Sequence, residues 1–563
     1  MIRARQDGPD FSPRAPTLKL RRHSRWLLLL IAGVFALPGW AASAEALQAK
    51  LEARFKDDRT GACVAAALID NGQVVRAKTC AQPRSAAVPG YDSVFEIGSV
   101  TKTMTAFLVA DLILQGRWSL DDPLAKHLPP GTALPRQGER QILLRDVLTH
   151  TSGLPGLPPG FSAKNPSDPY ADVNEPALLA SLGKVQLTRP IGSQFEYSNF
   201  AMMLVSSAVA RSYGSDFESA LTSHLFVPLK MDGAHVERPR GPRPKATGHL
   251  PSGMPTVDWH AANNLAGVGM VRASLDDMVL YAQAHLGHAD AALLARLQLT
   301  RQPLRGASAM NWMLLTVQSR ELVAHEGGTG GFSSLVVLEP KAQRAVVILS
   351  DTSLTDLGGL GNLGNALLEL DTPPLRPRLA MAPPATLLAA MPGEYQFGGL
   401  NAKIWRDGPR LMAQADGQAA FELKYDSAGD FYPAGFSALL TPQWADGKVD
   451  RAVWRQGGGL LEVTRKGTQT ALTATDLRWK DLAGEYALTP QFKLRVFEEA
   501  GVLKVQGSGQ AAIAAELTGT DTFTIKAVGA VVEFKRDATG KVSSAVLKQG
   551  GQVIEGKRSG PAE

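Results

Sequence analysis

A serine and a lysine stand three positions apart in the segment FEIGSVTK, at the start of an apolar run that reaches Gly116. Residues at i and i+3 lie on one face of a helix, so the side chains of Ser99 and Lys102 are expected to meet. Burial disfavours the ammonium form of a lysine and lowers its pKa, which turns the amine into a base. The pair therefore predicts a serine nucleophile activated by Lys102. The alternative, an exposed surface lysine, fits the apolar flank poorly.

Two later segments place polar residues beside apolar elements. In FEYSNFAMM, Tyr197 and Asn199 precede an apolar helix, where reactive side chains are often presented. The alternative there is a plain turn with Asn199 as the helix N-cap. In AHEGGTGGF, His325 and several glycines precede a predicted strand, so the backbone can approach a ligand closely. No His-Glu-x-x-His spacing follows, so a zinc-protease motif is not indicated.

Net charge argues against a nucleic-acid partner. The chain of 563 residues has a formal charge of +6, and residues 1–44 account for most of it, with seven basic and two acidic side chains. The remainder is nearly neutral and has no basic stripe, so we expect no binding to nucleic acid. The length predicts two or three domains.

Residues 1–44 are predicted to be a cleaved signal peptide. Three arginines at 21, 22 and 25 precede WLLLLIAGVFALPGW, and the residues Ala-Ser-Ala at 42–44 fit a small-residue cleavage site. The apolar run is short for a membrane span of about 20 residues, so a retained anchor is the weaker alternative. We expect a periplasmic or secreted protein that meets the membrane only during export. The long stretch before the arginines also fits a start codon downstream of Met1.

The chain has two cysteines, Cys63 and Cys80, which flank an Asn-Gly pair at 71–72. Asn-Gly is typical of a two-residue type I′ hairpin turn. Pairing Asp70 with Gln73 then places the two cysteines opposite each other at a non-hydrogen-bonded pair, where side chains approach most closely. A cross-strand disulfide is predicted, which requires an oxidising compartment. Two buried free thiols are the alternative.

The remaining sequence divides into four parts. Residues 45–370 mix short strands with helical patterns, which predicts an α+β domain with an antiparallel sheet flanked by helices. Residues 371–386 are Pro-rich and indicate a linker. Residues 387–468 and 478–560 repeat each other at an offset of 91 to 93, for example in Gly-Glu-Tyr at 393 and 484. Their short alternating strands predict two small antiparallel β-barrels with a structural or shielding role.

The order Ser-x-x-Lys at 99, Tyr-x-Asn at 197 and His-x-Gly at 325 resembles the serine β-lactamase and penicillin-recognising superfamily. The similar branch holds class C β-lactamases, DD-peptidases, D-aminopeptidases and related esterases. LLRDVLTHTSGLPG at 143–156 and GVGMVRASLDDMVLYA at 267–282 are also similar to recurrent segments of that branch. The resemblance covers about 45 to 355 and implies metal-free, cofactor-free catalysis through a covalent acyl-enzyme.

The resemblance also implies a role for each catalytic residue. Ser99 is the nucleophile and Lys102 its general base. Tyr197 carries the proton towards the leaving group, and Asn199 holds the substrate amide.

The third motif would form the substrate-binding strand. By resemblance His325 replaces the lysine of the Lys-Thr-Gly motif, followed by Gly327, and the N–H groups of Gly328 and Ser99 form the oxyanion hole. Histidine is mostly neutral at pH 7 and binds a substrate carboxylate less firmly than lysine. This departure is more similar to peptidase and esterase members. Thr101, where Ser or Ala is usual, is a milder departure.

We therefore expect an exported serine hydrolase acting on amides or esters of a small molecule or short peptide, above all a D-amino-acid peptidase or amidase. A β-lactamase-like domain followed by two barrels resembles the three-domain D-aminopeptidase layout. The alternatives are β-lactam hydrolysis, then small-ester hydrolysis, and, outside enzymes, a sensor that binds cell-wall fragments. The presence of both Ser99 and Lys102 disfavours the sensor. No Gly-x-Ser-x-Gly elbow of an α/β-hydrolase occurs. The oligomeric state is left open.

Overall fold

The computed structural model describes most of the chain beyond the leader. The predicted signal peptide therefore lies outside the described residues, except for its last two positions. The described ranges are 43–81, 88–397, 400–445, 448–456, 459–466, 481–489, 492–499, 502–519, 521–525, 528, 530–537, 540–549 and 552–561.

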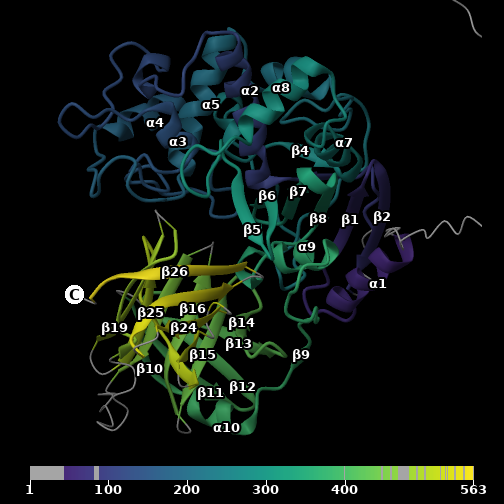
Figure 1. Ribbon diagram of the computed structural model, residues 1–563. Helices are drawn as coiled ribbons and strands as arrows, with labels where there is room; N and C mark the ends of the chain where they lie inside the picture. Colours follow the sequence, from purple (N-terminus) through teal and green to yellow (C-terminus); the bar gives the residue numbers. More distant parts are fainter. Residues whose placement is uncertain are drawn as a thin grey trace, which may run out of the picture. The chain divides into compact units, whose positions relative to one another are not determined.

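The first domain is built on a six-stranded antiparallel sheet with the order β2-β1-β8-β7-β6-β5 (Figure 1). The first and last parts of the domain thus meet in the middle of the sheet, where β1 pairs with β8. This confirms the predicted antiparallel sheet. The strands are β1 Cys63–Asp70, β2 Gln73–Cys80, β5 Met313–Val317, β6 Arg320–Gly328, β7 Ser333–Glu339 and β8 Arg344–Ser350.

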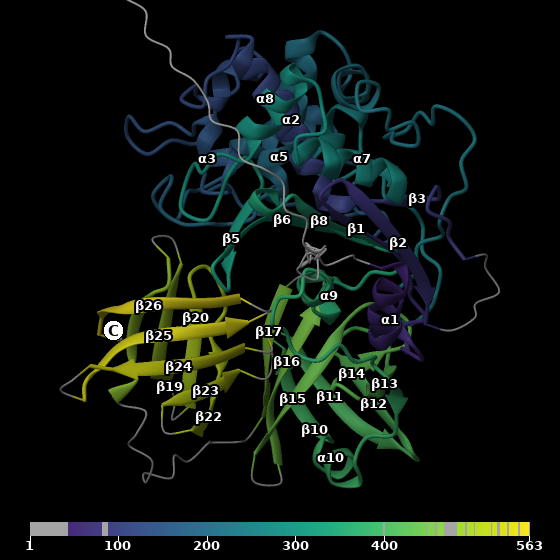
Figure 2. The same cartoon turned by 45° about the vertical axis from the view of Figure 1, so that its right-hand side comes forward.

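Both faces of this sheet are covered by helices (Figures 1 and 2). In β1, Ala65 and Ala67 join the core on one face, while Val64 and Ala66 join the core on the other. Burial on both faces explains why the strand reads as a continuous apolar run instead of an alternating one. One face packs against α2 Thr101–Leu114, α5 Asn199–Tyr213, α7 Leu275–His285 and α8 Ala291–Thr300, and the other against α1 Ala44–Phe55 and α9 Gly361–Leu367.

The hairpin of β1 and β2 has the register that its turn predicts. Asp70 pairs with Gln73 and Cys63 pairs with Cys80. The turn residues at 71 and 72 have φ values of 47° and 81°, the two positive angles of a type I′ turn. The structure contains the Cys63–Cys80 disulfide, with 4.0 Å between the two Cα atoms. The bond ties the edge strand β2 to the sheet.

Shorter elements complete the first domain. Two three-residue strands, β3 and β4, pair with each other. In the chain, β3 leads into the Ser-x-x-Lys segment and β4 leads into the helix α7. Their bounds are β3 Val94–Glu96 and β4 Arg272–Ser274, and the remaining helices are α3 Leu144–Leu148, α4 Glu175–Leu182 and α6 Phe217–Leu221, which continues into a π-helical turn at Thr222–Phe226.

The first repeat forms a closed barrel. Its strands follow the order β12-β11-β10-β17-β16-β15-β14-β13, and an additional pairing of β12 with β13 closes the ring. The short strand β9 Ala380–Met381 adds to β13, and α10 Ala385–Ala390 precedes the barrel. The barrel strands are β10 Gly393–Phe397, β11 Leu400–Asp407, β12 Arg410–Ala415, β13 Phe421–Asp426, β14 Phe431–Pro433, β15 Leu439–Ala445, β16 Lys448–Gln456 and β17 Gly459–Arg465.

The second repeat has the same strand order in a barrel that is nearly closed, which confirms the two-barrel prediction. The duplication extends to side chains: the buried Tyr395 donates to the carbonyl of Met391 at 2.7 Å, and the buried Tyr486 donates to that of Leu482 at 2.6 Å. The strands are β18 Gly484–Ala487, β19 Lys493–Glu499, β20 Val502–Gly507, β21 Ile513–Ala514, β22 Glu516–Gly519, β23 Thr522–Ile525, β24 Ala530–Arg536, β25 Val542–Gln549 and β26 Gln552–Gly560.

A buried ion cluster joins the linker and the segment before β1 to the first barrel. Asp426 is fully buried and accepts from Arg59 Nε at 2.8 Å and from Arg378 at 3.0 Å. Arg378 also pairs with Asp430 at 2.8 Å. Arg59 lies over the ring of Tyr432, 3.5 Å from its centroid. Charges buried in this way need their partners, because an unpaired buried ion is costly.

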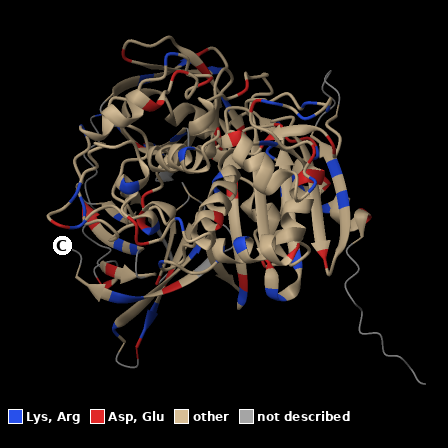
Figure 3. Ribbon diagram, turned by 90° about the horizontal axis from the view of Figure 1, so that it is seen from above, with Lys and Arg blue, Asp and Glu red and all other residues tan. Residues whose placement is uncertain are grey.

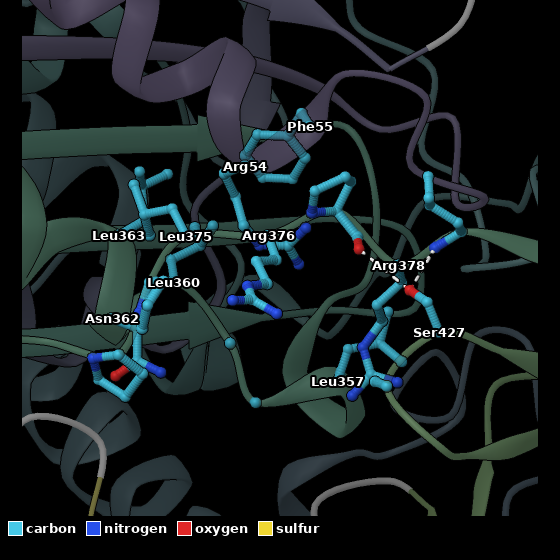
Figure 4. Close-up of a pocket in the computed structure, with 17 residues that line it drawn as sticks. Arg54, Phe55, Leu357, Leu360, Asn362, Leu363, Leu375, Arg376, Arg378 and Ser427 are labelled. Carbon is cyan, nitrogen blue, oxygen red and sulfur yellow. Dashed lines mark hydrogen bonds between the residues drawn. The ribbon is translucent and has the colours of Figure 1, made fainter.

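Next to this cluster lies a cavity of about 510 Å³, bordered by α1, α9 and the Pro-rich linker (Figure 4). None of the predicted catalytic residues lines it. Two of its arginines already have carboxylate partners, since Arg54 pairs with Asp58 and Arg378 with Asp426. The cavity thus lies where the linker meets the first domain and the first barrel.

The charge distribution of the described residues agrees with the sequence. Basic and acidic residues alternate along the ribbons, without a continuous basic band in this view (Figure 3). Across the described ranges, none of the helices combines the length and the apolar character needed to cross a bilayer.

Candidate active site

Ser99 and Lys102 meet at the entrance of the central helix. Ser99 lies in the 3₁₀ turn Gly98–Val100, and α2 begins directly after it at Thr101. The Lys102 Nζ atom lies 3.0 Å from Ser99 Oγ, as the i, i+3 spacing predicts. Lys102 is 0 % exposed, whereas Ser99 is partly exposed. The nucleophile can therefore reach a substrate while its partner stays out of water.

The environment of Lys102 makes it a base. Burial lowers the pKa of its amine from 10.5 to about 7, so a large fraction is neutral at physiological pH. The Nζ atom also donates to the carbonyl oxygen of Val268 at 2.6 Å, which holds it in place. The ring of Tyr197 lies below, with its centroid 4.8 Å from Nζ. The exposed-lysine alternative is thus wrong.

Tyr197 lies against the same pair. Tyr197 is 37 % exposed as a residue, but desolvation of its hydroxyl beside Ser99 raises the pKa above the usual range, and a hydrogen bond with Ser99 opposes this only in part. The tyrosine therefore stays protonated through the physiological range. A phenol that keeps its proton beside Ser99 and Lys102 can donate to a leaving group and be reprotonated by the lysine.

The residues after Tyr197 differ from the plain-turn alternative. Ser198, and not Asn199, is the N-cap of α5, and its Oγ accepts from the backbone N–H of Ala201 at 3.0 Å. Asn199 is the first helical residue, and its Nδ2 donates to the hydroxyl of Tyr170 at 2.9 Å. The capping task falls to the serine, so the asparagine amide is oriented by Tyr170 instead.

His150 belongs to this site, although no role was predicted for it from its sequence context. Its ring centroid lies 4.4 Å from that of Tyr197, and its Nδ1 accepts from the backbone N–H of Ser198 at 3.2 Å. The backbone of His150 has a φ of 54°, unusual for a non-glycine residue. His150 belongs to THTSG, part of the segment 143–156 that is similar to a recurrent family segment. However, 47 positions separate His150 from Tyr197, so no helix or strand periodicity predicts their contact.

Strand β6 brings His325 to the site. His325 is buried, with 6 % of its surface exposed. This burial, together with nearby Lys102, lowers the pKa of the imidazole to about 3. The ring is therefore neutral at pH 7. Its Nδ1 lies 2.8 Å from the backbone oxygen of Glu326.

Glycines allow β6 to rest directly on the turn that holds Ser99. A Cβ on Gly327 would lie 2.1 Å from the oxygen of Ile97 and 3.0 Å from the nitrogen of Ser99. A Cβ on Gly98, which has a φ of 50°, would lie 2.6 Å from the nitrogen of Gly328. The backbones that carry the Ser99 and Gly328 N–H groups are thus in contact, as an oxyanion hole built from both would require.

A profile of the family described as Beta-lactamase matches residues 49–367, more than half of the chain. The chain belongs to the β-lactamase family. This β-lactamase-family protein is thus a serine hydrolase with the α+β fold of its relatives, and Ser99, Lys102, Tyr197 and His325 lie in its matched region.

Curated relatives of this β-lactamase-family chain carry several activities in their names. D-alanyl-D-alanine-carboxypeptidase/endopeptidase AmpH of Escherichia coli K12 is 34% identical over 30% of this chain and 43% of its own length. The protein named Beta-lactamase from the same strain is 28% identical over 34% of this chain and 48% of its own length. The matches thus span less than half of each of these two relatives.

Several solved structures align with part of this chain. One is a β-lactamase/D-alanine carboxypeptidase from Yersinia pestis complexed with citrate, with 22% identity and a TM-score of 0.47. The aligned part covers 55% of this chain and 94% of the Yersinia pestis chain.

Proposed function

We propose that this protein is an exported serine hydrolase that cleaves amide or ester bonds through an acyl-enzyme on Ser99, with short D-amino-acid peptides or amides as its substrates. The observation that carries the proposal is the pairing of Ser99 Oγ with the Nζ of a fully buried lysine at 3.0 Å. A buried amine with a pKa of about 7 is a competent base for a serine hydroxyl.

Acylation follows from the contacts of these residues. Neutral Lys102 takes the proton of Ser99 Oγ, and the oxygen forms a bond to the substrate carbonyl carbon. The resulting oxyanion accepts hydrogen bonds from the N–H groups of Ser99 and Gly328. Tyr197 then gives its proton to the leaving nitrogen or oxygen and regains one from Lys102, while the bond to the leaving group breaks.

Deacylation reverses these roles with water as the nucleophile. Lys102, neutral again, accepts a proton from water through Tyr197, and the hydroxide attacks the acyl carbon. The second oxyanion forms in the same N–H pair. Its collapse breaks the bond to Ser99 Oγ, which recovers its proton from Lys102, and the carboxylic acid product leaves.

The choice of substrate rests on the third motif and on the relatives. A neutral His325 offers no ammonium to a substrate carboxylate, which disfavours efficient β-lactam turnover. The name of AmpH supports peptide bonds of D-amino acids. β-Lactam hydrolysis is the second candidate, supported by the relative named Beta-lactamase. Small esters come third, and a non-catalytic sensor of cell-wall fragments is the alternative outside enzymes.

Export and partners belong to the same proposal. The basic and apolar leader at 1–44 and the Cys63–Cys80 disulfide support a periplasmic or secreted location. A mature chain of nearly zero net charge supports small-molecule or short-peptide substrates and no nucleic-acid partner.

The deciding experiment combines two measurements on the mature protein. Intact mass is recorded after exposure to benzylpenicillin, and hydrolysis of D-alanine p-nitroanilide is followed in parallel. A stable adduct together with release of p-nitroaniline supports the peptidase or amidase. Rapid penicillin turnover without an adduct favours the β-lactamase instead. If neither reaction occurs but p-nitrophenyl acetate is cleaved, the esterase is favoured.

The matched control is Ser99→Ala, which removes one oxygen atom from a partly exposed position. We expect turnover and adduct to disappear while the melting temperature stays within a few degrees, because no packing atom is lost. An active Ser99→Ala protein would contradict the assignment. A wild-type protein that binds peptidoglycan fragments but cleaves none of the three substrates would support the sensor.

A further inference from the structure

One arginine in the cavity beside α1, α9 and the Pro-rich linker has no counter-charge. The lining contains three arginines, Arg54, Arg376 and Arg378, but no aspartate or glutamate. Arg54 and Arg378 pair with carboxylates that lie outside the lining. The exposed Arg376 has no ion pair and no hydrogen bond with any other residue that the structure describes. Its guanidinium is therefore available to an anion.

Most of the other lining side chains are apolar. They include Phe55, Leu357, Leu360, Leu363 and Leu375. In the view of Figure 4, the Arg376 side chain lies between the leucines at 360, 363 and 375 and Arg378. A volume of about 510 Å³ is in the range of small-molecule sites, which are mostly apolar with a few polar groups that fix the ligand's orientation. The cavity therefore combines an apolar wall with one free positive charge.

Asn362 adds a second polar group to the same lining. It is the second residue of α9, and its Oδ1 atom is buried without a hydrogen-bond partner among the described residues. A buried carbonyl oxygen is costly to leave unpaired, so this atom is suited to accept an N–H from a bound molecule. The carboxylate that Arg376 would attract cannot supply that N–H. The two polar groups thus require different parts of one ligand.

We propose that this cavity binds a small molecule with a terminal carboxylate, an amide N–H beside it and an apolar body. N-acylated amino acids and the C-terminal ends of short apolar peptides share this chemistry. The carboxylate pairs with Arg376, whose planar guanidinium can donate two parallel hydrogen bonds to it. The amide N–H donates to Asn362 Oδ1, and the apolar body is removed from water against the leucines. Ser99 and Lys102 do not line this cavity, so this binding does not depend on the proposed function.

Calorimetry on the mature Ser99→Ala protein tests the ligand class without turnover. The probe is N-decanoylglycine, which is compared with N-decanoylglycinamide, a molecule without the carboxylate, and with N-decanoylsarcosine, a molecule without the N–H. We expect the acid to bind at least about 10-fold more tightly than the glycinamide, because a charged hydrogen bond is lost, and about 3- to 10-fold more tightly than the sarcosine derivative. Equal binding of the acid and either analogue overturns the proposal.

Trileucine distinguishes the two sources of this chemistry. Tighter binding of trileucine than of N-decanoylglycine assigns the cavity to peptide ends, and the reverse order assigns it to acylated amino acids. Binding of neither probe overturns the proposal.

Substitutions in the lining locate the bound probe. Arg376→Gln should weaken binding of N-decanoylglycine at least about 10-fold and leave that of the glycinamide nearly unchanged. Arg243→Gln is the matched control, since Arg243 is also exposed, also precedes a proline and does not line this cavity. A loss in Arg376→Gln that is no greater than in Arg243→Gln overturns the proposal.

Asn362→Leu should remove the preference for N-decanoylglycine over the sarcosine derivative, because the acceptor of the N–H is gone. A preference that persists in the folded variant contradicts the role of Asn362. Thermal unfolding shows whether each variant is folded. If Asn362→Leu is not, the three probes on the Ser99→Ala protein and the two arginine variants still decide.

Discussion

The imidazole of His150 lies against the phenol ring of Tyr197, with 4.4 Å between ring centroids and 32° between the ring planes. The same imidazole accepts the backbone N–H of Ser198. His150 holds this position at a positive φ, which costs a non-glycine residue about 1–2 kcal/mol. One side chain thus fixes both the ring and the backbone of the Tyr-x-Asn segment.

Replacing His150 should reduce the chemical step more than substrate binding. We expect His150→Ala to lower kcat about 10- to 100-fold with a smaller change in KM, because Tyr197 loses its fixed position. His150→Asn tolerates the positive φ and retains an acceptor, so it should lose less. Steady-state kinetics on D-alanine p-nitroanilide with thermal unfolding check this. Equal kcat in all three proteins would contradict a positioning role.

The pH dependence should report Lys102. Its folded pKa of about 7 lies below its ordinary value, so the base is neutral above pH 7 and protonated below it. We expect kcat/KM to reach a plateau above about pH 8 and to fall about tenfold per pH unit well below 7. An acid limb near pH 4.5 instead would point to a carboxylate base.

The same shift affects stability, with a sign that can be stated. Between about pH 7 and about pH 10.4 the unfolded lysine binds a proton that the folded one does not. The contribution of Lys102 to the free energy of unfolding therefore rises with pH through this window and is smallest below pH 7.

Gly327 should not tolerate a side chain. A Cβ there would meet the oxygen of Ile97 at 2.1 Å, so β6 and the Ser99 turn would have to separate. We expect Gly327→Ala to lower kcat/KM by at least about 100-fold, because displacements of about 1 Å have effects of that size. Gly361→Ala is the control, since Gly361 is the first residue of α9 and a Cβ there would meet nothing within 4 Å. Loss of activity in both variants would refute the explanation.

The ion cluster at Asp426 should matter for stability. Asp426→Ala leaves Arg59 and Arg378 buried with one carboxylate fewer, and we expect the free energy of unfolding to fall by about 3–5 kcal/mol. Glu321→Ala removes an exposed partner of Lys341 and should cost less than about 1 kcal/mol. Denaturant unfolding of both variants measures the difference, and equal losses would contradict it.

Short-range rules predicted part of this molecule well. The Asn-Gly turn at 71–72 fixes the register of β1 and β2, because a two-residue turn leaves no freedom to slip. The pairing of Cys63 with Cys80 follows from this register. The contact of Ser99 with Lys102 is equally local. In both cases fewer than 20 residues separate the partners.

The parts that escaped prediction depend on distant backbone. The carbonyl of Val268, which holds Lys102, has no sequence signature, because every residue carries one. The role of His150 depends on a fold that brings it into contact with Tyr197 and Ser198, 47 and 48 positions later in the chain. The neutral tautomer of His325 depends on a single backbone contact. Sequence named the residue types of the site, while chain geometry set their protonation.

The duplicated barrels bring a folding problem that the first domain does not have. The two copies share the order of their strands, and the Tyr395–Met391 contact of one is repeated as the Tyr486–Leu482 contact of the other. During folding β10 can meet its own neighbour β17 or the equivalent β26, and exchange between copies is a characteristic failure of repeated domains. Because β17 precedes β26 in the chain, it is synthesised first, and the first barrel can close before its competitor has been made. The order of the chain thereby protects the pairing that sequence similarity puts at risk.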